Sequence, residues 1–130
     1  MLTIKMITPQ GLYKTTEGKI MNIVTTDGER GILPSHMPMV AMLKISVVSI
    51  EETGGREHYA VSGGMFYLDH DNQVTLLSDA IENVKDIDEK RALNAKVKAE
   101  ENMKTTDGQD YLNAEIALKK ALNRLHAIKN

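Results

Sequence analysis

Apolar and polar residues alternate with a period of two near the start of the chain, where Thr3 and Lys5 separate Leu2, Ile4 and Met6. Successive side chains of a β-strand point to opposite faces, so this alternation is typical of a strand with one buried face. Segments of similar composition follow in the first two thirds of the chain, at residues 19–25, 45–51, 56–61, 65–68 and 73–77.

Turn-forming residues separate these segments. Asp27-Gly28, Thr53-Gly54-Gly55 and the polar run 69–72 each stand where a hairpin would reverse the chain. Ser62-Gly63-Gly64 interrupts the alternation and predicts a bulge or a tight strand corner. Short strands at regular spacing favour an antiparallel β-sandwich or flattened barrel, which we expect to span residues 1–84.

The periodicity changes after Lys85, where apolar residues begin to recur at spacings of three and four. Asp86 with Glu89 predicts a helix N-cap and its capping partner, and Thr105-Thr106-Asp107-Gly108 predicts the break between two helices. We therefore expect a two-helix antiparallel hairpin over residues 85–130. The apolar side of its first helix consists of Ala92, Ala95 and Ala99, and that of its second of Tyr111, Ala114, Leu118, Ala121, Leu125 and Ile128.

The predicted contact between the two helices is thin. Alanine side chains bury little area, at about 25 cal/mol per Å² of apolar surface, and short helices depend on what they pack against. Two interpretations follow: the hairpin stays permanently docked on the β-sandwich, or it detaches from the β-sandwich as part of the protein's function.

Composition excludes several classes of protein. The 130 residues carry a net charge of −2 and contain no cysteine and few aromatic residues, so we expect no thiolate metal site and no nucleic-acid partner. No apolar run approaches the ~20 residues of a membrane helix and no leader opens the chain, so we expect membrane association only through partners. Charge also divides along the chain, because residues 1–84 carry a net −4 and residues 85–130 a net +2.

The sequence offers little catalytic chemistry. Its histidines, His36, His58, His70 and His126, form no HxH or HExxH pair, and Ser62-Gly63-Gly64 lacks the GxSxG frame of a serine nucleophile. Neither a Walker-type loop nor a GxGxxG element is present. We expect a protein without enzymatic activity of its own and without a required cofactor. A small metal-dependent hydrolase built on His36, His58 and His70 is the alternative from the enzyme class.

One segment, Arg30–Leu43, is unusually apolar for a predicted loop, since ten of its fourteen residues are apolar or proline. Its Gly31-Ile32-Leu33-Pro34-Ser35-His36-Met37-Pro38 stretch resembles the G-I-(L/Y)-P-G-H-x-P segment of the epsilon subunit family of F-type ATP synthases. Further stretches match that family in the same order along the chain. They are Ile7–Gly11, Thr26–Gly31, Ala60–Gly64 and Ala80–Ala92.

The resemblance implies a ten-stranded β-sandwich followed by a helical hairpin. It also implies a non-catalytic subunit of the rotating central stalk, which binds the gamma subunit and the polar loops of the c-ring while other subunits make ATP. Proton or sodium flow drives that synthesis, and the hairpin can inhibit ATP hydrolysis. We therefore expect a peripheral protein, held at the cytoplasmic face of the bacterial cell membrane through its complex.

Positions matching the family give candidate contacts with other subunits. Glu29, Ser35, His36 and Met37 are the candidates in the β-sandwich, and Lys119, Lys120 and Arg124 are candidates for binding an acidic loop of the beta subunit. Ser35 replaces the family's usual glycine, so a backbone with φ above zero there would be strained.

Residues 86–92 match the family's nucleotide-binding signature, (I/L)-D-x-x-R-A, which makes ATP a candidate regulatory ligand. Lys98 and Lys120 stand where the best ATP binders have arginine, which grips phosphate as a bidentate fork. Without the family, Asp88 and Arg91 are a common surface pair, and a free-standing nucleotide-binding sensor is a second alternative. The candidate ATP-binding residues are Glu82, Ile87, Asp88, Arg91, Ala92, Lys98, Lys120 and Arg124.

Overall fold

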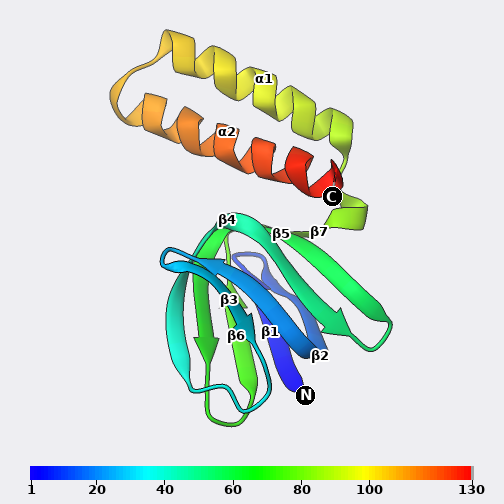
Figure 1. Cartoon of the computed structure of the whole chain (residues 1–130). Helices are drawn as coiled ribbons and strands as arrows, with labels where there is room; N and C mark the ends of the chain where they lie inside the picture. Colours follow the sequence, from blue (N-terminus) through cyan, green and yellow to red (C-terminus); the bar gives the residue numbers. More distant parts are fainter. Residues whose placement is uncertain (130) are drawn as a thin grey trace. The chain divides into compact units, whose positions relative to one another are not determined.

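The computed structural model describes residues 1–129, which form seven strands, one 3-10 turn and two helices (Figure 1). Contacts divide the chain into two compact units, Met1–Asn83 and the part from Val84 on, and each is described by itself. The strands are β1 (Leu2–Thr8), β2 (Gly11–Thr25), β3 (Gly28–Ile32), β4 (Met39–Glu52), β5 (Gly55–Leu68), β6 (Gln73–Leu77) and β7 (Ile81–Asn83). The 3-10 turn η1 (Val84–Asp86) precedes helices α1 (Glu89–Thr105) and α2 (Gly108–Lys129).

The strands form one sheet that closes on itself. Its order is β1-β6-β5-β4-β2-β3, and β1 also pairs with β2. The ring therefore consists of β1, β6, β5, β4 and β2, and β3 lies outside it. The short strand β7 pairs with β5. The predicted hairpins β2–β3, β4–β5 and β5–β6 are confirmed. The β1–β6 pairing is parallel, which the alternation did not predict, and it is the contact that closes the sheet.

The strands of the described part are fewer and longer than the ten short ones that the resemblance implied. β2, β4 and β5 run for 14 or 15 residues each, because glycines that looked like strand ends lie inside strands. A Cβ on Gly18 would lie 2.6 Å from Cγ2 of Ile50, and one on Gly64 would overlap the carbonyl oxygen of Leu77. These glycines therefore allow close packing, and Gly63 and Gly64, with φ of 81° and 117°, form the predicted strand corner.

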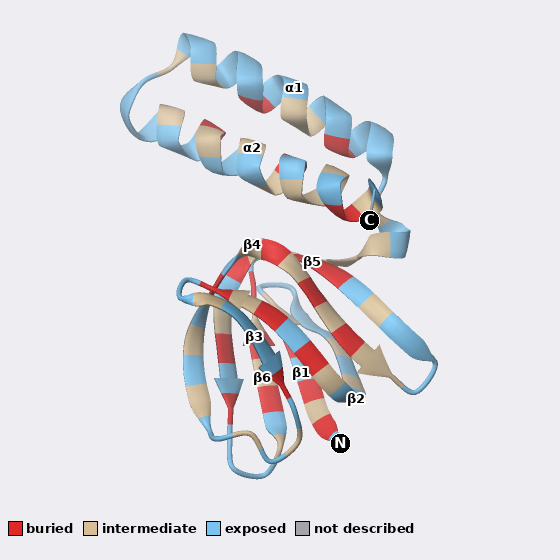
Figure 2. Cartoon of the chain, in the orientation of Figure 1, coloured by how far each residue is buried: buried red, intermediate tan, exposed pale blue. Residues whose placement is uncertain are grey.

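The β unit has one apolar core, lined by alternate residues of every long strand (Figure 2). Leu2, Ile4 and Met6 of β1 are fully buried, as their alternation predicted. Tyr59 and Phe66 of β5 are the largest fully buried side chains.

A polar cluster is attached to this core. Lys14 Nζ donates to the Tyr59 hydroxyl at 2.7 Å, the Tyr59 hydroxyl donates to Glu52 Oε2 at 2.6 Å, and Thr16 Oγ1 donates to Glu52 Oε1 at 2.7 Å. Burial raises the pKa of Tyr59 to about 12, and its hydrogen bond to Glu52 acts in the same direction. The hydrogen bond that Lys14 donates to Tyr59 raises the pKa of Lys14. Both groups therefore hold their protons more tightly in the folded protein.

The two helices pack along the apolar sides predicted from the sequence, a contact that we call the seam, but the N-cap residue of α1 differs from the predicted one. Asp88, not Asp86, is the N-cap of α1, and its Oδ1 accepts from the Arg91 backbone N–H at 3.1 Å. Asp86 lies in η1 because the chain makes a separate 3-10 turn before the helix starts. The residues buried between the helices are alanines: Ala92, Ala99, Ala114, Ala121 and Ala127. Leu118, Leu125 and Ile128 are half-buried, so the seam is as thin as the sequence predicted.

The Tyr59 cluster predicts how stability depends on alkaline pH. A group whose folded pKa is raised contributes stability that is complete below its unfolded pKa and is lost as pH rises through the folded pKa. The free energy of unfolding should therefore fall between about pH 10 and about pH 12 as Tyr59 loses its proton, and loss of the proton of Lys14, whose pKa is also raised, acts in the same direction.

Urea unfolding at about pH 8 and about pH 11 checks this expectation. Tyr59→Phe should be less stable than the native chain at the lower pH, because Glu52 loses a buried donor, and should lose less on going to the higher pH. Tyr67→Phe, which changes an exposed tyrosine, is the control. An equal alkaline loss in Tyr59→Phe and the native chain would contradict the assignment.

Candidate docking surface and nucleotide-signature residues

The segment 33–38 forms the loop between β3 and β4, and we call it the docking loop. Its turn is closed by the His36 backbone N–H, which donates to the Leu33 carbonyl at 3.1 Å. Met37 is 79% exposed and Leu33 is 53% exposed, so the loop presents apolar side chains to solvent.

Ser35 has the left-handed backbone that its place in the loop suggested, with a φ of 69°. For a residue with a Cβ, this conformation is about 1–2 kcal/mol less favourable than the right-handed one. Such strain persists only where the surroundings hold it. The Ser35 backbone N–H donates to Asn72 Oδ1 at 2.7 Å, which is a contact between the loop and the β5–β6 turn.

The histidines do not assemble a metal centre. His36 Nδ1 lies 2.8 Å from the Met37 carbonyl oxygen, a bond within its own loop. Over residues 1–129 no group of three or more His, Asp or Glu side chains is arranged to hold a metal ion. The hydrolase alternative built on His36, His58 and His70 therefore has no supporting cluster.

Strand register assembles an apolar face on the outside of the β unit. Met42 pairs with Met65 across β4–β5, Met65 with Leu77 across β5–β6, and Leu77 with Ile7 across β6–β1. Residues paired in this way lie on the same side of a sheet. The intervening residues, such as Phe66 and Leu76, are fully buried, so the row of four faces outward.

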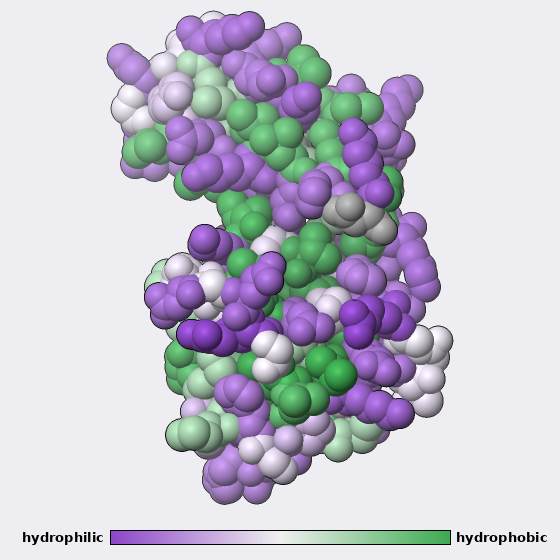
Figure 3. Space-filling model, viewed as in Figure 1, coloured by the Kyte–Doolittle hydropathy of each residue, from purple (hydrophilic) through white to green (hydrophobic). Residues whose placement is uncertain are grey.

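A second row extends this apolar face towards the docking loop. Val40 pairs with Tyr67, and the exposed fractions are 64% for Val40, 59% for Met42 and 38% for Tyr67. Hydrophobic side chains also interrupt the polar surface of the β unit in Figure 3. We define the apolar face as Ile7, Val40, Met42, Met65, Tyr67 and Leu77.

A shallow cavity of about 320 Å³ adjoins the apolar face, where Pro9, Met65 and Leu77 are among its lining residues. Gly64, part of the strand corner, is also among its lining residues. The candidate residues predicted from the sequence are Glu29, Ser35, His36 and Met37, and of the apolar face the apolar segment 30–43 includes only Val40 and Met42. The signal that could have found the face is the apolar character of Val40, Met42, Met65 and Tyr67 at strand positions that alternate with core residues.

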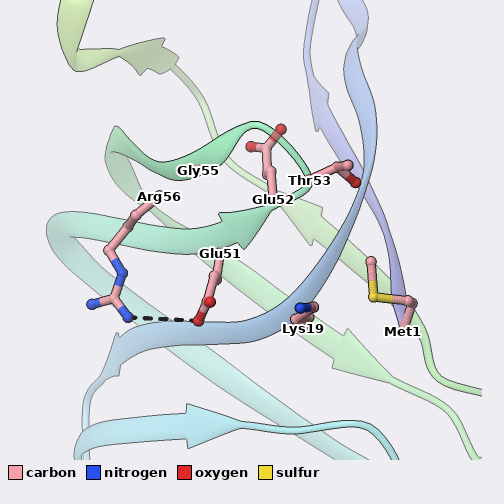
Figure 4. A pocket seen from close by; sticks show the side chains of 7 residues that line it. All are labelled: Met1, Lys19, Glu51, Glu52, Thr53, Gly55 and Arg56. Carbon is pink, nitrogen blue, oxygen red and sulfur yellow. Dashed lines mark ion pairs between the residues drawn. The ribbon is translucent and has the colours of Figure 1, made fainter.

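A second cavity, of about 410 Å³, has a charged lining (Figure 4). Lys19 and Glu52 line it, and Arg56 Nη2 lies 3.9 Å from Glu51 Oε2, so charges of opposite sign face each other.

The nucleotide-signature residues fall into two groups in the structure. Ile87, Asp88, Arg91 and Ala92 lie together at the beginning of α1, where the Ala92 N–H donates to the Asp88 carbonyl at 3.0 Å. Ala92 is buried in the seam, and the Asp88 carboxylate caps the helix. Glu82 lies in β7, in the other unit.

The basic candidates lie along both helices. Because the helices are antiparallel, the second half of α2, with Lys120 and Arg124, runs back beside the first turns of α1 (Figure 1). The 3-10 turn η1 also contacts α2. Lys98 lies about two turns beyond Arg91, roughly 10 Å along the helix. Lys119 Nζ is 3.7 Å from Glu115 Oε1, an i,i+4 pair on the surface of α2.

Comparison with known proteins gives matches over the whole chain. A family model described as "ATP synthase, Delta/Epsilon chain, beta-sandwich domain" matches residues 1–84, and one described as "ATP synthase, Delta/Epsilon chain, long alpha-helix domain" matches residues 85–129. A relative from Bacillus licheniformis, "ATP synthase epsilon chain", is 42% identical over 125 residues, covering 95% of each chain. One of the same name from Desulfitobacterium hafniense is 35% identical over 128 residues, covering 98% of this chain and 96% of that protein.

Solved structures agree on the fold. A chain of the Euglena gracilis mitochondrial ATP synthase superposes with a TM-score of 0.81 at 21% identity, covering 99% of this chain and 81% of that one. A chain of the Tetrahymena thermophila mitochondrial ATP synthase central stalk and c-ring gives a TM-score of 0.65 at 17% identity, covering 95% and 92%. Together with the matched motifs of the docking loop, these findings show that the chain belongs to the ATP synthase delta/epsilon family.

Proposed function

We propose that this chain is the epsilon subunit that couples the gamma subunit to the c-ring, through contacts made by the docking loop and the apolar face. Family membership makes it a subunit of the central stalk and not the catalytic component of ATP synthase. The observation that carries the docking proposal is the outward row of apolar residues across four strands. Met42 in this row is 59% exposed, Ile7, Met65 and Leu77 are half-buried, and contiguous apolar side chains at a surface are characteristic of interaction sites.

The chemistry of the apolar face suits the gamma subunit. Met42 and Met65 are flexible enough to adapt to a partner, and Tyr67 is of the type enriched at interface centres. The docking loop continues the face, because Val40 follows Pro38 by two residues and Met37 is the most exposed large apolar side chain.

A polar edge is available for the loops of the c-ring. β3 pairs only with β2 among the strands of residues 1–129, and its Glu29 and Arg30 are exposed. Charged side chains on an edge strand prevent unwanted strand pairing and can bind polar loops of a partner. We assign this contact to Glu29, at the start of the strand that leads into the docking loop with Ser35, His36 and Met37.

The proposal also makes the hairpin a regulatory element that inhibits ATP hydrolysis. Its seam is made of alanines, so little apolar area holds the helices together. Leu93, Val97, Leu112 and Ile116 are 44–50% exposed, which leaves apolar surface that a partner could cover in another arrangement. Lys119, Lys120 and Arg124 supply the positive charge for an acidic loop of the beta subunit.

ATP is the proposed regulatory ligand of the hairpin. Arg91 on α1 with Lys120 and Arg124 on α2 supplies positive charge from both helices, so a bound polyphosphate favours the folded hairpin. At 100 times its Kd a ligand contributes ~2.7 kcal/mol. Changing the ratio of folded to extended hairpin from 1:99 to 99:1 needs a difference in binding free energy between the two states of ~5.5 kcal/mol. ATP therefore biases the hairpin, and contacts with neighbouring subunits complete the change.

The proposal locates the subunit at the cytoplasmic face of a bacterial membrane, attached through the complex. Neither described helix has the length and apolar character needed to cross a membrane. Attachment in this proposal comes from the gamma subunit and the c-ring.

Val40→Lys tests the docking proposal. The substitution puts a charge where an apolar side chain becomes buried against the gamma subunit. It should raise the Kd for the catalytic sector, prepared with the gamma subunit but without this chain, by at least about tenfold. Thr53→Lys is the matched control, since Thr53 is exposed at the other end of the same hairpin. Titration calorimetry measures both. Equal Kd values for Val40→Lys, Thr53→Lys and the native chain, with unchanged melting temperatures, would refute the docking face.

Lys98→Arg/Lys120→Arg tests the ATP proposal by a gain of affinity. Arginine binds phosphate with two parallel hydrogen bonds, so the double variant should bind ATP more tightly than the native chain, by about fivefold or more. Arg124→Ala should weaken binding, and Arg56→Ala in the β unit should leave it unchanged. Calorimetry with ATP and with GTP measures these affinities. No binding heat from either the native chain or the double variant would rule out the nucleotide role.

A further inference from the structure

Asn72 connects two parts of the β unit that are far apart in sequence. Its side-chain Oδ1 accepts from the Ser35 N–H at 2.7 Å, and its backbone carbonyl accepts from the Thr3 N–H at 3.0 Å. Thr3 lies in β1 between the fully buried Leu2 and Ile4. The docking loop is therefore connected through a single residue to a strand anchored in the core.

The turn that carries Asn72 is itself held by hydrogen bonds. Asp69 Oδ1 accepts from the N–H groups of Asp71 at 2.8 Å and Gln73 at 3.0 Å, and the Asp69 N–H donates to the Gln73 carbonyl at 3.1 Å. Gln73 then pairs with Thr3 in the parallel β1–β6 ladder. These bonds hold the backbone of the turn from which the Asn72 side chain projects.

The docking loop has few other means of support. Pro34 and Pro38 have no N–H to donate, and the bonds of His36 stay within the loop. In the described part of the chain, the bond from Ser35 to Asn72 is the hydrogen bond that joins residues 33–38 to another segment.

Both partners of this bond have left-handed backbones, with φ of 69° at Ser35 and 61° at Asn72. Asparagine adopts this conformation more readily than most residues, whereas serine has no such preference. Residues held in such conformations cluster at functional sites, where the surroundings impose them. The turn bond from the His36 N–H to the Leu33 carbonyl sets the positive φ of Ser35, and the bond from Asn72 holds the Ser35 N–H from outside the loop.

We propose that Asn72 is a positioning residue for subunit docking, which holds the docking loop in the conformation that presents Leu33 and Met37 beside the apolar face. This inference rests on the proposed docking of that loop to the gamma subunit. Asn72 acts through Ser35, by fixing the loop before the partner arrives, which reduces the ordering cost of binding.

Asn72→Gly and Asn72→Asp form the test pair. Glycine keeps the left-handed backbone but removes the acceptor, whereas aspartate keeps an acceptor oxygen and tolerates the same φ. Asn72→Gly should bind the catalytic sector about fivefold more weakly, and Asn72→Asp should bind within about twofold of the native chain. Hydrogen exchange at the Ser35 amide of the free protein should be faster in Asn72→Gly and close to native in Asn72→Asp.

The outcomes separate this inference from the docking proposal. If Val40→Lys weakens binding while Asn72→Gly binds like the native chain, the docking face stands and the positioning role is wrong. Equal weakening by Asn72→Gly and Asn72→Asp, or native exchange at Ser35 in Asn72→Gly, also overturns it. If Val40→Lys leaves binding unchanged, the docking proposal fails, and the Ser35 exchange still decides whether Asn72 holds the loop.

Discussion

The parallel pairing of β1 with β6 is the constraint on which the rest of the β unit depends. It closes the sheet, because β1 then contacts both β2 and β6. Closure separates two sets of side chains: Met6 and Leu76 on the inside, and Ile7 and Leu77 on the outside. The same register that buries the core therefore assembles the apolar face, and Thr3, in the same ladder, supports the turn of Asn72.

Local patterns in the sequence predicted much of this architecture. Alternation identified β1, turn residues identified three hairpins, and the three-and-four spacing identified the helical seam. These features depend on neighbouring residues, so periodicity reveals them. The N-cap was misplaced by two residues, because Asp86 and Asp88 have the same capping chemistry and tertiary structure selects between them.

Contacts between distant residues could not be predicted in this way. The parallel β1–β6 pairing, the contacts of Lys14 with Glu52 and Tyr59, and the bond from Ser35 to Asn72 each join positions more than thirty residues apart. Strand register creates them, and one sequence does not show which strands become neighbours. The candidate contacts near Ser35 came from family resemblance, and the apolar character of residues 30–43 was visible in the sequence, whereas the register joined Val40 and Met42 to Ile7, Met65, Tyr67 and Leu77.

In the proposed complex, the docking loop and the apolar face are buried against the gamma subunit. Amide hydrogen exchange of the native chain, free and bound to the catalytic sector that contains the gamma subunit, measures this burial. Exchange in the bound state should be slower at residues 33–42 and 65–68 and unchanged at the β4–β5 turn around Thr53. Protection around Thr53, with no change at residues 33–42 and 65–68, would contradict this burial.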